Sequence, residues 1–309
     1  MKVYFDGRNS LFLDKFANSE SIEVTSSCQD SDIIISEDDV SNLNEINKTI
    51  YICKEAPLAH QRRRFYSHFD EFSLVICHDP EKDKSNQIPF TPDNASQFFP
   101  YNPAEKLSLT RTDTTLSLRS IFFAGQIKTN ETAPDCFNAH NITKLRKIFG
   151  DYFIDELPGS TFIGKGWDGQ TTKVVNWRVD KQDQITKSGC DFVLALENTI
   201  YPNYLTEKIW DGFNSDRVTL YLGDPNIESH IPLNCFIDLR PYYDLSSKSF
   251  DLPALKHRLT DMTQGEYDDI LNNAREFRRK AIGKHKHYRH LFTDTIINFI
   301  NSSAVAKQG

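Results

Sequence analysis

Long apolar runs and an excess of positive charge are both missing from this sequence. Its continuous apolar stretches are short, as in Phe192–Leu196, whereas a membrane-spanning helix needs ~18 apolar residues. Acidic residues number 43 and basic residues 36, which gives a net charge of −7 and argues against a protein that binds nucleic acid over its whole surface. Hydrophobic residues make up 39% and charged residues 26%, which excludes a disordered chain, collagen and a coiled coil.

Cysteines at metal-binding or redox spacing are also absent. None of the six cysteines belongs to a C-x-x-C pair, so the usual zinc and dithiol motifs are missing. Cys53, Cys77 and Cys190 lie in or beside apolar runs, and we expect them to be small buried hydrophobic side chains. Met1–Phe5 has the pattern of a first strand rather than of a leader peptide. We therefore expect a cytoplasmic protein.

Short apolar strands alternate with helical segments along the whole chain. Several of the strands are uninterrupted apolar runs, which is typical of parallel strands covered on both faces. The alternation predicts an α/β fold. The helices are expected at 142–149, 206–214, 253–262 and 266–282. The strands are expected at Val3–Phe5, Ile33–Ile35, Ile50–Cys53, Phe72–Cys77, Ile121–Ala124, Thr161–Ile163, Phe192–Leu196, Val218–Leu222 and Cys235–Ile237.

A polar segment from Asp79 to Arg119 separates the strands into two groups. It is rich in Pro, Asn, Ser and Thr, a composition typical of connections. A chain of 309 residues at ~150 residues per domain also suggests two domains. We predict one α/β unit over residues 1–118 and a second, nucleotide-binding unit over 119–309, with the last helix packing back on the first unit. Ligands of such sheets bind beyond the carboxyl ends of the strands.

The stretch from Glu197 to Phe213 carries the most information about function. Its pattern predicts a strand, a turn and a helix with Thr206 as N-cap and with Ile209 and Phe213 on the buried face. Lys208 then falls in the first turn, where a cation is unfavourable by ~0.3–1 kcal/mol. Free N–H groups at a helix start favour phosphate, so a diphosphate site is one interpretation. A solvated lysine paired with a nearby carboxylate is the other.

This stretch resembles the donor-binding signature of the α1,3-fucosyltransferases, glycosyltransferase family 10. Phe192–Lys208 matches the pattern F-x-x-x-x-E-N-[ST]-x-x-x-x-Y-[VIL]-T-E-K-[IL] nearly position for position. Val218–Gly223 is similar to the strand that follows it, with Thr219 where the family usually has proline. Lys54–His60 resembles, more weakly, the E-S-P-x-H stretch of the family's first domain, and Phe99–Tyr101 resembles its P-x-Y.

The resemblance implies a GT-B fold, in which two Rossmann-like domains face a cleft. It implies inverting transfer of L-fucose from GDP-fucose to a hydroxyl of an oligosaccharide or polysaccharide acceptor, such as a bacterial surface polysaccharide or lipopolysaccharide. It also implies that the reaction needs no metal ion and no cofactor, only the nucleotide-sugar donor. Two alternatives stay open: a transferase of another nucleotide sugar, and a non-catalytic protein that binds a nucleotide sugar or a glycan.

The resemblance also assigns roles to residues. Glu55 is the candidate general base that would deprotonate the acceptor hydroxyl, and Glu207 would contact the ribose or stabilise an oxocarbenium-like sugar. Lys208 and the helix start would stabilise the departing diphosphate. The remaining donor-binding candidates from the resemblance are Asn198, Tyr204, Glu197, Thr206 and Arg146. Gly164 is a candidate for another reason, since it follows a predicted strand, where the backbone can approach a nucleotide. Among the candidates from the resemblance, Glu197 could equally be a structural strand-end residue, and Arg146 has Arg178 as its rival.

Two further patterns have open interpretations. Trp167 follows a Gly-rich turn, where it would either stack on a sugar or base or belong to the core. A basic segment at 284–290 is preceded by Arg275, Arg278, Arg279 and Lys280. It would be either a solvated helix face or a peripheral contact with anionic lipid at the inner face of the membrane.

Overall fold

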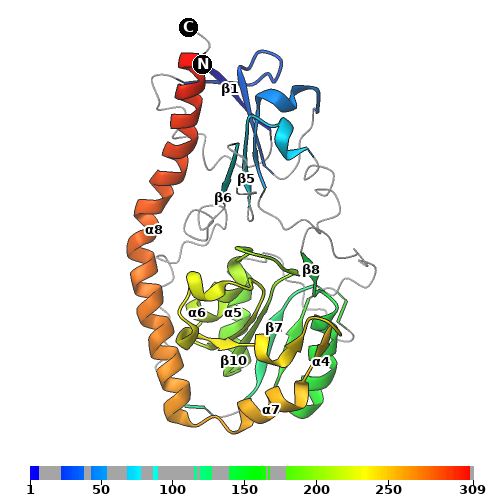
Figure 1. Cartoon of the computed structure of the whole chain (residues 1–309). Helices are drawn as coiled ribbons and strands as arrows, with labels where there is room; N and C mark the ends of the chain where they lie inside the picture. Colours follow the sequence, from blue (N-terminus) through cyan, green and yellow to red (C-terminus); the bar gives the residue numbers. More distant parts are fainter. Residues whose placement is uncertain are drawn as a thin grey trace.

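The computed structural model describes residues 1–6, 22–37, 43–53, 68–77, 86–89, 115–116, 119–126, 139–164, 166–167 and 179–306. These residues form two separate parallel sheets and one long helix that runs beside both (Figure 1). None of the helices in this part of the chain combines the length and the apolar character that crossing a lipid bilayer requires.

The first sheet has six parallel strands in the order β2-β1-β3-β4-β5-β6. β4 and β5 are buried along their whole length, and all their residues except Thr49 are apolar, as expected for central strands of a parallel sheet. The sequence pattern missed the two edge strands, β2 and β6, since each is three residues long and mostly polar. The strands are β1 Lys2–Asp6, β2 Glu23–Thr25, β3 Ile33–Glu37, β4 Thr49–Ile52, β5 Leu74–Cys77 and β6 Gln87–Pro89.

The second sheet has five parallel strands in the order β13-β12-β10-β7-β9. β10 lies in its middle and pairs with β12 in the register Phe192↔Val218. Two short antiparallel pairs, β8 with β11 and β14 with β15, stand outside it. The strands are β7 Ile121–Ala124, β8 His140–Asn141, β9 Thr161–Ile163, β10 Phe192–Leu196, β11 Thr199–Ile200, β12 Val218–Leu222, β13 Ile237–Asp238, β14 Tyr243–Asp244 and β15 Ser249–Phe250.

In its described part, the domain of the second sheet contains the α-helices α4 Leu145–Glu156, α5 Val179–Ser188, α6 Glu207–Asn214 and α7 Leu252–Thr260. The predicted helix at 206–214 is confirmed as α6, and its apolar residues Ile209 and Phe213 are buried against Ala195 and Tyr221 of the sheet. Gly212 brings α6 close to β12, because a Cβ atom there would lie 2.0 Å from the Thr219 hydroxyl. Short 3-10 helices occupy 43–48, 69–71, 227–229, 233–235 and 240–242.

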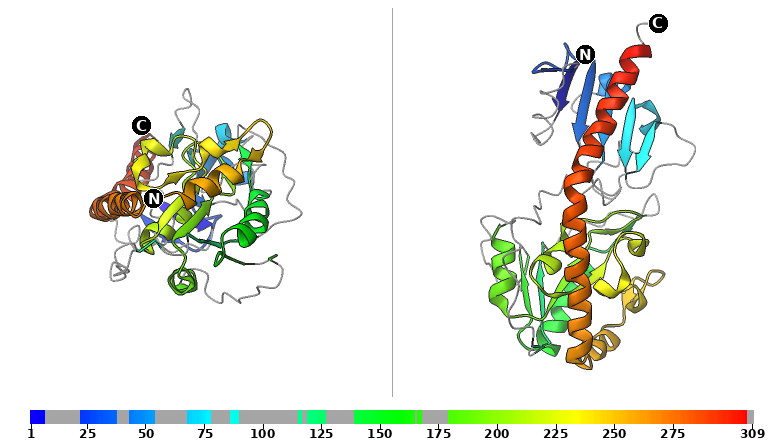
Figure 2. Two further views of the ribbon diagram at one scale, coloured as in Figure 1. Left: turned by 90° about the horizontal axis from the view of Figure 1, so that it is seen from below. Right: turned by 90° about the vertical axis from the view of Figure 1, so that its left-hand side faces the viewer.

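The last helix, α8, runs from Gln264 to Ala306. Its 43 residues correspond to about 65 Å at 1.5 Å per residue, and Figure 2 shows it lying along both domains. Tyr267 and Leu271 near its start belong to the core of the second sheet. Ile296 and Ile300 near its end belong to the core of the first sheet. The predicted helix, 266–282, was therefore too short.

Two of the arginines that precede the basic segment at 284–290 point toward the second domain. Both Nε and Nη2 of Arg275 lie 3.0 Å from the Asp216 carboxylate, and Arg278 Nη1 donates to the Phe213 carbonyl at 2.6 Å. These two side chains tie α8 to the end of α6 and do not form an exposed cationic face, which corrects that part of the expectation. The side chains of 284–290 lie outside the described part of the structure.

The polar connection enters the second domain at the corner between α7 and α8. Leu116 N donates to the Gln264 side chain at 2.7 Å. Arg119 Nη1 donates to the carbonyls of Leu259 and Met262, both at 2.8 Å. Among the described residues, these contacts lie between the last strand of the first sheet, β6, and the first strand of the second, β7. The border between residues 118 and 119 stays a prediction.

Candidate active site

Two glycines meet where β7 and β9 end. Gly164 has φ +132°, and a Cβ atom there would lie 2.3 Å from the Gly125 carbonyl oxygen, so only glycine allows this approach. The indole N–H of Trp167 donates to the same carbonyl at 3.0 Å. Its ring is buried among Phe123 and Phe162. Trp167 is therefore a core residue, and stacking on a sugar or base is not its role.

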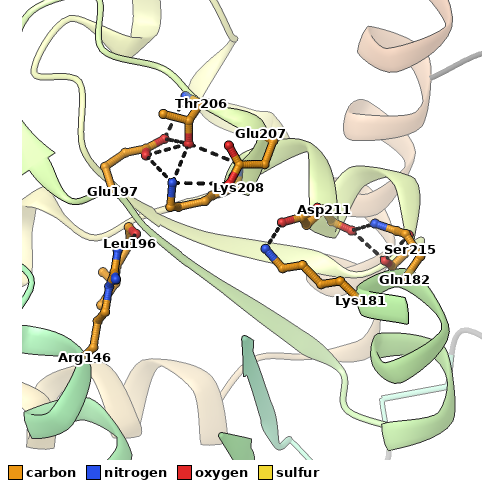
Figure 3. Close-up of polar contacts among 10 residues, drawn as sticks. All are labelled: Arg146, Lys181, Gln182, Leu196, Glu197, Thr206, Glu207, Lys208, Asp211 and Ser215. Atoms are coloured by element: carbon orange, nitrogen blue, oxygen red, sulfur yellow. Dashed lines mark hydrogen bonds and ion pairs between the residues drawn. The ribbon is translucent and has the colours of Figure 1, made fainter. Parts of the chain in front are cut away.

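The central feature of the site is a lysine held between two carboxylates where β10 ends and α6 begins (Figure 3). Lys208 Nζ lies 3.1 Å from Glu197 and 3.4 Å from Glu207, and it donates to the Thr206 hydroxyl at 2.8 Å. Thr206 donates its backbone N–H to Glu197 at 2.9 Å and its hydroxyl to the same carboxylate at 2.7 Å. Thr206 is also the N-cap of α6, as predicted.

Solvent reaches the three charged groups to different extents. The side chain of Glu197 is 0% exposed, that of Lys208 17% and that of Glu207 34%. Burial raises the pKa of Glu197, although Lys208 opposes that change. Burial also acts on Glu207, but the cations Lys208 and Lys181 outweigh it and lower its pKa to about 2. Burial would lower the pKa of Lys208, yet the two carboxylates raise it. The ammonium therefore stays charged and is fixed in place.

Arg146 of α4 approaches the same strand end from the opposite side. It donates to the Gln126 carbonyl at 3.0 Å and to the Leu196 carbonyl at 3.5 Å. It also donates to the Asn198 side chain. Tyr204 is buried, and its pKa is raised by that burial and by Glu197, with Asn198 among the groups that oppose the change. Arg146 thus joins the end of β10 to Asn198, and Tyr204 is buried close enough to Glu197 and Asn198 for both to affect its pKa.

The turn before α6 is fixed by the end of β12. Asn203 has φ +58°, a left-handed conformation that asparagine tolerates better than most residues. Its N–H donates to buried Asp224 at 3.0 Å, and His230 Nε2 lies 3.0 Å from its side-chain oxygen. Gly223 is needed beside the site, because a Cβ atom there would lie 2.4 Å from Glu197 Cγ.

The structure brings the predicted residues of the signature together. Glu197, Asn198, Tyr204, Thr206, Glu207 and Lys208 lie around the end of β10 and the start of α6, and Arg146 reaches the same point. Gly164 lies at the end of β9 on the same sheet. Glu55, the candidate base, and Arg178, the rival of Arg146, lie outside the described residues. Within the described part of the chain, no cluster of His, Cys, Asp and Glu side chains is placed to hold a metal ion.

Sequence reasoning missed one charged group that touches this site. Lys181 of α5 forms an ion pair with Asp211 of α6, one helical turn beyond Glu207. No signal predicted α5, because its sequence VDKQDQITKS contains only two apolar residues. The position of Lys181 beside Asp211 follows only from the fold, which packs α5 against α6.

Chemically, the arrangement presents a fixed cation and the first N–H groups of a helix at the carboxyl end of a parallel sheet. Helix starts bind phosphate through these N–H groups and the helix dipole, and lysine adds a point charge. Glu207 adds a partly exposed, permanently ionised acceptor. The site can therefore hold an anionic group and accept hydrogen bonds from hydroxyl groups beside it.

Comparison with known proteins gives this geometry a family context. The family model "Glycosyltransferase family 10 (fucosyltransferase) C-term" matches residues 162–263. The human 4-galactosyl-N-acetylglucosaminide 3-alpha-L-fucosyltransferase 9 is 38% identical over 65 residues, which cover 20% of this chain and 18% of that protein. The GDP-fucose protein O-fucosyltransferase 3 of Xenopus tropicalis is 42% identical over 43 residues, 14% of this chain and 9% of the relative. The alignment thus spans less than a fifth of either curated relative.

Solved structures extend the likeness over both domains. An alpha1,3-fucosyltransferase crystallised with GDP-fucose superposes with a TM-score of 0.58 at 16% identity and covers 93% of this chain and 90% of that chain. The structure of an alpha1,3-fucosyltransferase alone superposes with the same TM-score at 14% identity. At such identities the likeness establishes the fold, and the expected GT-B architecture is confirmed. Within the second domain of this GT-B chain, residues 162–263 are similar to the C-terminal domain of glycosyltransferase family 10, the fucosyltransferases.

Proposed function

We propose that this protein is an inverting glycosyltransferase that transfers L-fucose from GDP-fucose to a hydroxyl group of a glycan. The observation that carries the proposal is Lys208, a charged ammonium fixed by Glu197 and Thr206 at the start of α6. Its place at the carboxyl end of a parallel sheet is where nucleotides bind in such folds. The family match over 162–263 includes this residue.

In the proposed reaction the chain supplies charged groups on both sides of the sugar carbon C1, one set at the departing diphosphate and one at the attacking acceptor. The acceptor oxygen attacks C1 of the sugar as the bond from C1 to the diphosphate oxygen breaks, and GDP departs with the bonding electrons. Lys208 and the N–H groups of α6 stabilise the charge that develops on the diphosphate, with Arg146 behind Asn198 supporting the pocket. Glu207 stabilises the oxocarbenium-like sugar or binds the ribose. Glu55 accepts the proton of the acceptor hydroxyl.

The free site is already organised for an anion. Lys208 is only 17% exposed, and Glu197, Glu207 and the Thr206 hydroxyl hold its ammonium group in one position. A diphosphate therefore has to share this ammonium with Glu197 and Glu207, which weakens the net attraction. In return, the Lys208 side chain loses little entropy when the donor binds, because these contacts already restrict it.

The comparisons support the donor and the acceptor class only through relatives. The solved neighbour was crystallised with GDP-fucose, and the human relative is named a fucosyltransferase of galactosyl-N-acetylglucosaminide. We propose GDP-fucose and a glycan by this analogy. We further propose a surface polysaccharide or lipopolysaccharide, made on the cytoplasmic side of a membrane, as the acceptor.

The test is calorimetric titration with GDP, UDP, CDP, GDP-fucose and GDP-mannose in the presence of EDTA. We expect GDP and GDP-fucose to bind, Lys208→Met to weaken both, and the surface variant Lys147→Met to leave both unchanged. Glu55→Gln should retain GDP-fucose binding and lose transfer to a glycan acceptor. Preference for UDP or CDP would replace fucose by another sugar. No nucleotide binding at all would overturn the transferase and favour a glycan-binding protein.

A further inference from the structure

The loop after β12 carries a buried carboxylate and a partly buried imidazole that the proposed reaction does not use. The side chain of Asp224 is 0% exposed and that of His230 17%. Asp224 Oδ2 and His230 Nε2 lie 3.5 Å apart, and the short 3-10 helix 227–229 lies between the two residues in sequence. We call residues 224–230 the support loop, because both of these side chains contact one residue of the turn that precedes α6.

That residue is Asn203, which the support loop holds at two points. Its backbone N–H donates to Asp224 Oδ1 at 3.0 Å, and His230 Nε2 lies 3.0 Å from its side-chain oxygen. Amide and carboxylate oxygens can only accept, so Nε2 carries a hydrogen and donates it. Asn203 has φ +58°, a conformation that residues with a side chain avoid. The support loop therefore stabilises a turn that is unfavourable by itself.

The support loop is itself fastened to the second sheet. The Asp224 N–H donates to the hydroxyl of Tyr221 on β12 at 2.9 Å, and the Asp224 carboxylate accepts the Asn226 N–H at 2.9 Å. Arg240, just beyond β13, donates to the Glu228 carboxylate at 2.8 Å. The carboxylate and the imidazole thus contact Asn203 from a loop that is tied to β12 and to the segment after β13.

The turn at Asn203 leads directly into the residues that hold the donor-site lysine. The Asn203 carbonyl accepts the Leu205 N–H at 3.1 Å, and Thr206 is the next residue. Thr206 donates its N–H to Glu197 at 2.9 Å, and its hydroxyl accepts from Lys208 Nζ at 2.8 Å. A change of φ at Asn203 would therefore displace the N-cap of α6, and with it one of the groups that fix Lys208.

We propose that His230 is a positioning residue of the donor site, which works with Asp224 to hold the turn at Asn203 in the conformation that places Thr206 and Lys208 for the diphosphate. This inference rests on the proposed function, because it assigns the diphosphate to Lys208. His230 acts through Asn203, and its loss should affect how often the site is correctly formed, with no loss of the groups that meet the donor.

The size of the effect follows from the fraction of molecules in which the turn is formed. A donor that binds only the formed turn has an apparent dissociation constant equal to the intrinsic one divided by that fraction. Removing the bond from His230 takes away one ordinary hydrogen bond, which changes the equilibrium of the turn by about three- to tenfold. The turn can open while both sheets stay folded, so donor binding should respond more strongly than global stability.

The experiment compares His230→Ala, His230→Gln and the control Tyr267→Phe. The side-chain nitrogen of glutamine can reach the position of His230 Nε2, so His230→Gln should restore the bond to Asn203. Tyr267→Phe also removes one buried hydrogen bond, at 2.8 Å to the Asp191 carbonyl, at the end of β10 away from the donor site. NMR measures hydrogen exchange of the Asn203 amide, calorimetry measures binding of GDP and GDP-fucose, and urea unfolding measures global stability.

In His230→Ala we expect the Asn203 amide to exchange, and GDP and GDP-fucose to dissociate, about three- to tenfold more readily than in the wild type. A transfer assay should show this loss in the donor KM with kcat nearly unchanged, because the turn is formed in every donor complex. His230→Gln should retain wild-type exchange and affinity. Tyr267→Phe should lower the urea midpoint and leave the exchange of Asn203 and donor affinity at their wild-type values.

Two results would overturn the role of His230. One is wild-type donor affinity in His230→Ala, whether or not the Asn203 amide exchanges faster. The other is an equal loss of affinity in Tyr267→Phe, which would trace the effect to general destabilisation. Failure of the wild type to bind any nucleotide would instead overturn the proposed function, and the exchange of Asn203 would still report whether His230 holds the turn.

Discussion

The replacement Lys208→Met tests the central cluster most directly, and its cost can be bounded from the structure. It removes the cation 3.1 Å from Glu197 and leaves a fully buried carboxylate with Thr206 as its partner. Breaking such a pair costs ~3–5 kcal/mol if the remaining charge is retained. Glu197 can escape by taking up a proton, however, and burial already raises its pKa.

Because Glu197 can take up a proton, the free energy of unfolding lost in Lys208→Met has an upper limit, and this limit depends on pH. Relative to an unfolded glutamate with the ordinary pKa of 4.5, holding Glu197 neutral at pH 7 costs at most about 3.4 kcal/mol, at 1.36 kcal/mol per pH unit. At pH 5 the same limit falls below about 1 kcal/mol. The free energy of unfolding of Lys208→Met should therefore approach that of the wild type as the pH falls from 7 to 5.

Urea unfolding of Lys208→Met at several pH values measures this dependence of its free energy of unfolding on pH. A double variant supplies the control. Lys208→Met/Glu197→Gln carries an amide that stays neutral at every pH, so it should be more stable than Lys208→Met at pH 7 and should lose the extra pH dependence. Both variants should bind GDP about 10- to 150-fold more weakly, the equivalent of one charged hydrogen bond of ~1.5–3 kcal/mol. An equal destabilisation by Lys208→Met at pH 5 and at pH 7 would refute the reasoning.

Three further predictions concern neighbouring features. Because the pKa of Glu207 falls from 4.5 to about 2 on folding, its contribution to stability is present above pH 4.5 and lost as the pH drops toward 2. Acid unfolding of Glu207→Gln should lack this component, and an identical acid transition would contradict it. Gly212→Ala places a methyl group 2.0 Å from the Thr219 hydroxyl and should cost ~1–3 kcal/mol in thermal unfolding, most of it restored by adding Thr219→Ala. Arg278→Met removes a buried hydrogen bond to the last turn of α6 and should lower the free energy of unfolding by ~1–3 kcal/mol. The control Lys280→Met, at an exposed position of the same helix, should change the urea midpoint little. Equal effects of the two variants would count against the inward role of Arg278.

The parts of the fold that sequence predicted well are those with uninterrupted apolar runs. Phe192–Leu196 and Val218–Leu222 are buried along their whole length, and their pattern gave the strand bounds directly. The polar edge strand Gln87–Pro89 was hidden in a segment that looked like a connection. The end of α8 was missed since the basic segment at 284–290 carries few apolar residues, and its final apolar positions serve the other domain.

The candidate site was predictable where its contacts are local. Glu197 and Thr206 are nine residues apart, and among the described residues Lys208 makes its hydrogen bonds and ion pairs within one strand–turn–helix motif. Asn203 and Asp224 are 21 residues apart, and Lys181 and Asp211 are 30 apart. Such pairs depend on how helices and strands pack together, which a single amino-acid sequence does not reveal. The position of Glu55 relative to Lys208 stays a prediction.

The long reach of α8 has a consequence for how the chain folds as it is made. Val3 and Ile300 share one hydrophobic core, although nearly the whole sequence lies between them. At ~5–20 residues per second, synthesis separates these two residues by about 15–60 s. During that interval the first sheet has been made while the apolar face that α8 later covers is open. We therefore expect the first domain to be the later of the two to complete its folding, and to rely on chaperones while the second domain is being translated.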